Sequence, residues 1–250
     1  MVRTGRLKTD DGRHIGEISV KTRIIIFLIL MFIPALVLGK LSTKTERLEM
    51  GGIVTKIDMP PESKFAYVSV WALIDAKPGV VWNTLKDIDN WPNWLPMNEK
   101  AFFVSAEAEK LITVQIARVR TKVEEINTQH PPDEDTPSPD GKWKRMAYES
   151  YNMPWPLKNE WVIRHYSFDE TENPFVATWR KVAADDDKDD GFWKVKGWTD
   201  DKHTHLEYYY RVKRKEGVPD VLFSGAIKLT VNSMIKSLRR EAKKRTGATS

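Results

Sequence analysis

The chain of 250 residues contains no cysteine, so disulfide bonds, thiolate nucleophiles and thiolate metal sites are all excluded. It also lacks the Gly-x-Ser-x-Gly turn of serine hydrolases, a glycine-rich phosphate loop and a dinucleotide-binding fingerprint. No sequence feature therefore nominates a catalytic residue or a cofactor. The sequence favours a binding protein over an enzyme.

Metal-binding patterns are also scarce. The chain has five histidines, and only His203 and His205 are spaced closely enough in sequence to suggest a shared ion. No third ligand motif accompanies this His-x-His pair, so we interpret it as a solvated turn rather than a zinc site. The acidic stretch from Asp185 to Asp190 lacks the ligand spacing and the distal glutamate of a calcium-binding loop. We therefore predict no metal site.

Acidic residues are few at both ends of the chain. Residues 1–40 hold seven Lys/Arg against three Asp/Glu, and residues 234–250 hold six against one. Since the net charge is +5, the part between these ends is acidic, with a net charge of −4. The basic character thus belongs to two terminal segments and not to a face of a domain, and no zinc-finger or RNA-binding signature is present. We predict no nucleic-acid partner.

Long hydrophobic runs are absent except near the N-terminus, where 15 uncharged residues extend from Ile24 to Leu38 behind a basic stretch. A spanning helix usually needs about 20 apolar residues, while the core of a signal peptide has about 7 to 15. Both remain open, and the long basic flank favours an uncleaved anchor. By the positive-inside rule, residues 1–23 are cytoplasmic, residues 24–39 form the transmembrane anchor or signal peptide, and the remainder is periplasmic or extracellular. Cleavage at Gly39 would instead give a secreted protein.

The rest of the chain predicts one α+β domain. Residues 40–64 are polar and broken by paired glycines and prolines, which indicates a linker, so the domain is predicted to span residues 65–245. It begins with a β-branched and aromatic strand at 65–75, a helix that opens at Pro78, and a Trp/Pro-rich turn. Seven further segments with turn signals between them indicate an antiparallel sheet. These strands are predicted at 101–106, 111–123, 145–151, 161–168, 175–182, 192–198 and 205–213.

A long amphipathic helix is predicted from Pro219 to Lys244. Its apolar face is marked by side chains that recur every three or four residues. They are Phe223, Ile227, Thr230, Met234 and Leu238. Six Lys/Arg gather toward its C-terminal end, where cations interact favourably with the helix dipole. This basic cluster caps a solvated helix end or, alternatively, contacts anionic lipid headgroups.

Three motifs, in this order, resemble those of the START-like superfamily, also called Bet v 1-like, which includes polyketide cyclases and lipid-transport proteins. Residues 76–96 are similar to its first helix and the following Trp-x-x-Trp-x-Pro turn. Residues 154–161 resemble its Pro-[Phe/Trp]-Pro…Asn-Arg segment, and residues 217–219 resemble its Gly-x-x-Pro start of the final helix. Glu160 stands where START domains usually carry arginine after the asparagine, so this segment does not identify a ligand.

The resemblance implies a helix-grip fold, in which a curved antiparallel sheet wraps the C-terminal helix and encloses a cavity for an apolar ligand. Pro154 and Pro156 cannot donate sheet hydrogen bonds, so they mark a bend between two strands near the cavity mouth. Alternation along 205–213 turns Tyr208 and Tyr210 inward. We predict a ligand site lined by side chains that could equally fill the core. They are Trp94, Trp155, Trp193, Tyr208, Tyr210, Phe223, Ile227 and Met234.

Two functions are compatible with this reading. The first is a membrane-tethered or exported domain that binds or transfers a lipid or other hydrophobic small molecule, with release governed by motion of residues 90–97 and the start of the final helix. The alternative is a polyketide cyclase or aromatase, which needs acids and bases inside the cavity. Four charged residues lie on predicted strands, and we expect them to form cross-strand ion pairs on the convex face. They are Arg145, Glu149, Arg164 and Arg180.

Overall fold

The computed structural model describes residues 43–105, 108–110, 123, 141–153, 159–184, 190–199 and 202–248. From Lys44 onward the chain forms one compact unit. The predicted anchor at 24–39 and the basic stretch before it lie outside the described residues. Within the described part of the chain, no helix is both long enough and apolar enough to cross a membrane.

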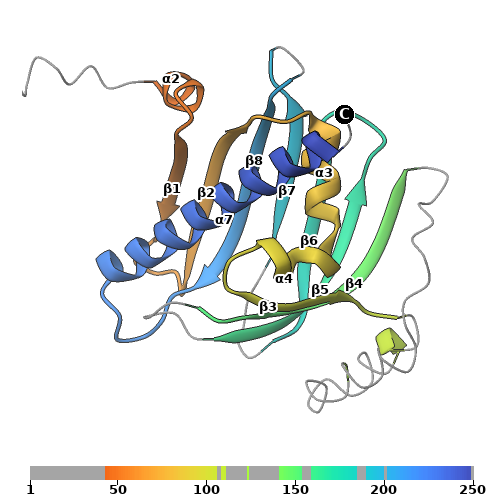
Figure 1. Ribbon diagram of the computed structural model, residues 1–250. Helices are drawn as coiled ribbons and strands as arrows, with labels where there is room; N and C mark the ends of the chain where they lie inside the picture. The colour runs from red at the N-terminus through yellow and green to blue at the C-terminus, as the bar shows by residue number, and fades with distance from the viewer. Residues whose placement is uncertain are drawn as a thin grey trace, which may run out of the picture. The chain divides into compact units, whose positions relative to one another are not determined.

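Eight antiparallel strands form one sheet in the order β1-β2-β8-β7-β6-β5-β4-β3. Their bounds are β1 Ile53–Asp58, β2 Phe65–Ile74, β3 Asn98–Phe103, β4 Lys142–Tyr151, β5 Glu160–Asp169, β6 Phe175–Ala184, β7 Asp190–Gly197 and β8 Thr204–Lys213. The helical elements are α2 Lys44–Glu49, α3 Pro78–Lys86, η1 Ile88–Asn90, α4 Trp91–Trp94 and α7 Asp220–Ala248. The curved sheet and the long C-terminal helix confirm the predicted α+β helix-grip fold (Figure 1).

The main core lies between the concave face of the sheet and the inner face of α7. Along β2 every second side chain from Ala66 to Ile74 is buried, while the intervening ones are partly exposed. The helix α7 crosses the sheet diagonally (Figure 1). It buries Phe223, Ile227, Val231, Ile235 and Leu238. A helix with such an apolar stripe must cover it with another layer, and the sheet provides that layer.

Helix α3 opens at Pro78, where the missing N–H breaks no hydrogen bond. Its side chain Trp82 is buried, and the indole Nε1 donates to the Glu170 carboxylate at 2.9 Å. The same carboxylate accepts from Lys86 Nζ at 2.7 Å and from Trp143 Nε1 at 3.3 Å. Desolvation raises the pKa of Glu170, but these donors outweigh it and lower the pKa overall. Glu170, which follows the end of β5, therefore connects α3 to β4 and β5.

The structure corrects part of the predicted linker. Residues 40–64 contain α2 and β1, and β1 pairs with β2 from Ile53 opposite Ala72 to Asp58 opposite Tyr67. The glycines that suggested a linker end a short helix instead, with Gly51 in the left-handed region at a φ of 76°. The strand predicted at 111–123 lies outside the described residues except Val123, which is helical.

Arg239 joins three parts of the fold through backbone carbonyls. Its Nε donates to Leu73 O at 3.0 Å, and its two terminal nitrogens donate to Gly51 O at 2.8 Å and Gly52 O at 3.4 Å. Burial lowers the pKa of this guanidinium, which means that these bonds offset a desolvation cost. The arginine ties α7 to β2 and to the turn between α2 and β1.

We expect Arg239→Met to lower the free energy of unfolding by roughly 1.5–3 kcal/mol, because charge-assisted hydrogen bonds to three backbone carbonyls are lost. Urea denaturation measures this change. Arg240→Met is the matched control, since Arg240 is exposed and should change stability by less than about 0.5 kcal/mol. Equal effects of the two substitutions would contradict the proposed role of Arg239.

The structure also corrects the reading of the His-x-His pair as a solvated turn. His205 lies within β8 and is only 5% exposed, and its Nδ1 has no hydrogen-bond partner. Burial lowers the pKa of His205; the nearby Glu207 opposes this shift, and Lys196 and Lys44 add to it. Among the described residues, no group of three potential metal ligands occurs.

This histidine predicts a loss of stability in acid. Because its pKa is lower in the folded state, the unfolded chain binds the proton more readily once the pH falls below the unfolded value of about 6.5. The contribution of neutral His205 to the free energy of unfolding is therefore fully present above that pH, and it is lost as the pH falls toward the pKa of the folded state. Melting temperatures at pH 7.5 and 5.5 should show a smaller acid-induced drop in His205→Gln than in the parent protein. An acid-induced drop that is the same in His205→Gln and in the parent protein would contradict this role of His205.

Candidate ligand-binding site

A cavity of about 490 Å³ lies between the sheet and α7. This volume falls within the range of roughly 300–1,000 Å³ typical of sites for drug-sized ligands. Its walls come from β4 to β8, from the inner face of α7, and from the segment after α4 that includes Leu95 and Met97. Lining residues continue past the end of β8 to the exposed Glu216, which marks a side where the cavity meets solvent.

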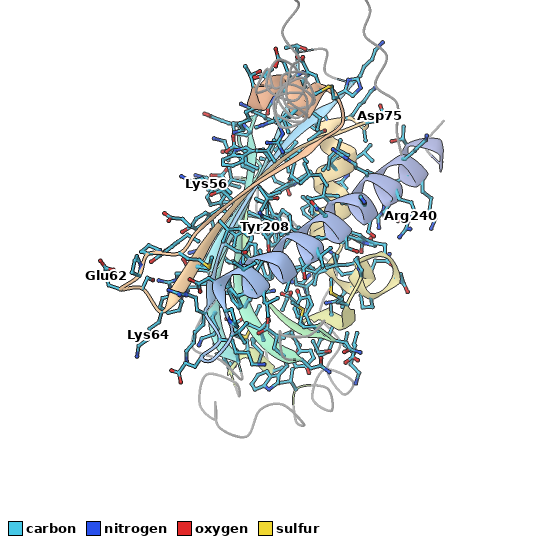
Figure 2. All side chains as sticks on the ribbon, turned by 90° about the vertical axis from the view of Figure 1, so that its left-hand side faces the viewer. Lys56, Glu62, Lys64, Asp75, Tyr208 and Arg240 are labelled. Carbon is cyan, nitrogen blue, oxygen red and sulfur yellow. The ribbon has the colours of Figure 1, made fainter. Side chains whose placement is uncertain are left out.

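Stacked aromatic rings form the sheet side of the cavity. Trp193 and Tyr208 lie on neighbouring strands with ring centroids 4.0 Å apart and planes at 12°. Tyr210 stacks on Tyr208 at 4.9 Å, and Trp179 contacts both Trp193 and Tyr208 at 5.7 and 5.8 Å. Figure 2 shows Tyr208 on the side of the sheet that faces α7. Because each ring is held by its neighbours, this wall is preorganised before a ligand enters.

Apolar side chains of α7 form the opposite wall. Phe223, Ile227, Val231 and Met234 line the cavity at helical spacing. They belong to the same stripe that packs on the sheet, so one face of the helix serves both the core and the site. The two walls together suit a ligand with a largely apolar body.

A buried polar cluster is set into this apolar surface. Glu149 on β4 is fully buried, and its carboxylate accepts hydrogen bonds from Tyr151, Tyr166 and Arg164. The Tyr166 hydroxyl lies 2.6 Å from Glu149 Oε1, and Arg164 Nη1 lies 3.1 Å from the Tyr151 hydroxyl. Three of these residues line the cavity, namely Tyr151, Arg164 and Tyr166. Glu149 lies behind them and holds them in place.

The two phenols of the cluster remain protonated at physiological pH. Burial raises the pKa of Tyr151 and of Tyr166 well above the ordinary value, and the charge of Glu149 adds to this effect. The cluster therefore presents a guanidinium and two neutral hydroxyl groups at the cavity wall. Such groups can hydrogen-bond a hydroxyl or carbonyl of a bound molecule.

The prediction that the strand charges form ion pairs on the convex face is wrong for Glu149 and Arg164. They are a cross-strand pair, but they face the cavity, because Glu149 lies opposite Val162 and Arg164 lies opposite Ala147, which puts them on a diagonal of one face. Arg145 stacks on the ring of Phe103 at 4.0 Å, and exposed Arg180 lies opposite Asp190. The register between strands cannot be derived from the sequence, so the faces of these side chains could not be assigned.

The structure brings six of the eight predicted ligand-binding residues to the cavity wall. They are Trp193, Tyr208, Tyr210, Phe223, Ile227 and Met234. Trp94 is not a lining residue; it is buried at the edge of Trp91, with ring centroids 6.5 Å apart, and Trp91 lines the cavity in its place. Trp155 lies outside the described residues. Contact of any of these side chains with a ligand stays a prediction.

The bend predicted at Pro154–Pro156 lies outside the described residues. The strands on either side of it, β4 and β5, are adjacent and pair from Tyr151 opposite Glu160. On its described flanks, the Asn159 side chain accepts a hydrogen bond from the Met153 backbone at 3.0 Å. Met153 and Glu160 both line the cavity, so these two flanking residues border the site.

Comparisons with known proteins agree with this geometry. Residues 74–239 match the model of the family described as polyketide cyclase / dehydrase and lipid transport. No curated protein matches the chain. Among solved structures, a STAR-related lipid transfer protein from Xanthomonas axonopodis is similar at a TM-score of 0.54 and 14% identity, with 77% of this chain and 94% of that one covered.

Two further structures share the fold. The Zhui aromatase/cyclase from Streptomyces sp. R1128 has a TM-score of 0.50 and 14% identity, covering 73% of this chain and 96% of that one. Human StAR-related lipid transfer protein 5 has a TM-score of 0.51 and 8% identity, covering 90% and 99%. Identities this low establish the fold alone. Since the family match spans more than half of the sequence, the chain belongs to the polyketide cyclase / dehydrase and lipid transport family, within the START-like superfamily.

Proposed function

We propose that this protein binds and carries one hydrophobic small molecule that has an apolar body and a hydrogen-bonding group. The observation that supports this most directly is the polar cluster of Tyr151, Arg164 and Tyr166 beside the aromatic and aliphatic walls of a cavity of about 490 Å³. The volume suits a single small lipid or comparable molecule. The lipid transfer proteins among the similar structures carry the same fold.

The cluster is better suited to recognition than to catalysis. Glu149 already accepts from two phenols and a guanidinium, so it has little capacity left to take a proton from a substrate. The tyrosines donate to this carboxylate and hold their protons firmly because burial raises their pKa. These groups can orient a ligand without changing it.

A cyclase or aromatase is the second candidate function. One observation favours it: Arg164 and Glu160 both line the cavity, so charged groups are present where that chemistry would need them. The similar aromatase/cyclase shows that the fold accommodates such an activity. Turnover of a linear polyketide analogue by the purified protein, lost in Arg164→Met, would support this candidate over simple binding.

Membrane attachment forms part of the proposal. The uncharged run from Ile24 to Leu38 and the basic residues before it support an anchor or an export signal, with the binding domain on the non-cytoplasmic side. N-terminal sequencing of the mature protein distinguishes the two, because only a cleaved signal removes residues 1–39.

Native mass spectrometry of the purified full chain tests the binding proposal. We expect a co-purifying hydrophobic molecule, and uptake of the neutral probe N-phenyl-1-naphthylamine after solvent extraction. Met234→Trp should reduce uptake, because Met234 lines the cavity, while Leu229→Trp on the outer side of the same helix should not. An empty cavity that takes up no probe would refute the proposal.

A further inference from the structure

The outer face of α7 exposes apolar side chains that neither the core nor the cavity uses. Val221, Leu222 and Leu229 are 80%, 46% and 71% exposed. They are three of the four large hydrophobic side chains found exposed in the described residues, and they lie within about two turns of one helix. Isolated exposed apolar residues are ordinary, but a group of them on one element indicates a contact surface.

Cations continue this apolar group along the helix. From Asp220 to Ala248 the helix carries seven Lys/Arg and two acidic residues, Asp220 and Glu241. Two of the cations are partly buried by contacts between elements: Arg239 donates to backbone carbonyls, and Arg245 pairs with Asp87. The other five are exposed, and they are Lys228, Lys236, Arg240, Lys243 and Lys244. Of these, Arg240 donates to Ser237 Oγ at 3.2 Å and Lys244 lies 3.8 Å from Glu241, both within α7. Figure 2 shows Arg240 on the side of α7 turned away from the sheet.

Gly225 leaves this face flat. It lies four residues from both Val221 and Leu229, on one row of the helix surface. A Cβ at this position would have no neighbour within 4 Å, so packing inside the domain does not require glycine there. Glycine is unfavourable inside a helix, but here it allows a surface to approach the helix backbone closely between two apolar side chains.

We propose that the outer face of α7, defined by these three apolar and five basic side chains, docks on an anionic lipid bilayer. The helix would lie along the membrane surface, with Val221, Leu222 and Leu229 in the headgroup and acyl boundary and the cations beside lipid phosphates. A second copy of the chain fits poorly, because the five cations of each copy would repel one another. A nucleic acid would satisfy the charges but leave the apolar group in water.

Docking in this way would place the cavity beside a lipid reservoir. The inner side of the same helix contributes Phe223, Ile227 and Met234 to the cavity wall. A ligand leaving the cavity along α7 would thus reach the membrane without crossing bulk water. This consequence rests on the proposed function, whereas docking itself can be measured with the cavity empty.

The absence of cysteine allows a direct test with single labelled positions in the full chain. Leu229→Cys carries an NBD fluorophore on the docking face, and Thr178→Cys carries it at an exposed position on β6. With phosphatidylcholine vesicles that contain phosphatidylglycerol, we expect a blue shift and quenching by brominated lipid at 229 and not at 178. Vesicles of phosphatidylcholine alone should give a much weaker response. Because each label reports its own surroundings, an anchor elsewhere in the chain cannot imitate this result.

Charge removal supplies the matched control. The triple variant Lys236→Gln, Arg240→Gln, Lys243→Gln should weaken the response at 229 by about fivefold per charge. A triple variant with the same change in net charge, Lys56→Gln, Lys77→Gln, Lys144→Gln, should change it little, since these exposed lysines lie on other elements. Figure 2 places Lys56 on the opposite side of the sheet from α7.

Three results would overturn docking: a label at 229 that stays in water on anionic vesicles, a shift that appears without vesicles through self-association, or equal losses in the two triple variants. Uptake of N-phenyl-1-naphthylamine by the same samples separates the two proposals. Retained uptake with no docking refutes this inference alone, whereas docking without uptake refutes the ligand-binding proposal alone.

Discussion

Arg164→Met is expected to lower the free energy of unfolding by roughly 3–5 kcal/mol, because it leaves a buried carboxylate without its countercharge. Glu149 is fully buried and Arg164 is nearly so, and their ion pair lies on the cavity face of β4 and β5. The Tyr151 and Tyr166 hydroxyls still donate to Glu149 in the variant, so the lower end of this range is the better expectation. Urea denaturation at neutral pH measures the loss.

The double variant Glu149→Gln, Arg164→Met tests the cause of this loss. It distinguishes the lost ion-pair interaction from the cost of leaving a buried carboxylate unpaired. Removing both charges leaves no uncompensated ion, so most of the stability should return. The amide can still accept from one tyrosine. If the double variant is as unstable as Arg164→Met, the arginine stabilises the fold through packing. If Arg164→Met itself lies within about 0.5 kcal/mol of the parent protein, the ion pair contributes no stability.

The fold could be predicted from the sequence because its signals are local. A first-turn proline with buried residues at helical spacing specified α3, and the recurrence of apolar residues from Phe223 specified α7. β1 was missed since its six residues lie between a glycine pair and a proline pair. Its place in the sheet depends on pairing with β2, which is a long-range interaction that composition does not record.

The site could be predicted only in part, for a related reason. Alternation within β8 placed Tyr208 and Tyr210 on the inner face, because one strand suffices for that argument. Assigning Glu149 and Arg164 to the cavity requires the register of β4 against β5, and β5 carries a register shift toward β6 between Ile163 and Arg164. A search for tyrosines two residues away from strand charges, as in Glu149 and Tyr151 or Arg164 and Tyr166, would have indicated the polar cluster.

Gly191→Ala is expected to lower the free energy of unfolding by roughly 2–4 kcal/mol, through overpacking within the aromatic wall. A Cβ at this position of β7 would lie under 3.0 Å from the Tyr209 carbonyl oxygen and from the Trp179 indole. The carbonyl belongs to the ladder between β7 and β8 and cannot shift without weakening it. The indole contacts the rings of Trp193 and Tyr208, so any movement of the indole would displace these two rings as well.

The same substitution at Gly225 provides the matched control for Gly191→Ala. Gly225 lies in α7 with open space around its missing Cβ, so Gly225→Ala should raise stability by about 0.5–1 kcal/mol through helix propensity. Urea denaturation of the two variants should therefore give changes of opposite sign. Because Trp179 lines the cavity, Gly191→Ala should also reduce uptake of N-phenyl-1-naphthylamine under native conditions, while Gly225→Ala leaves it unchanged. Unaltered uptake in a destabilised Gly191→Ala would mean that the wall absorbs the extra methyl group without losing its shape, and that the stacked rings are less rigid than their mutual contacts imply.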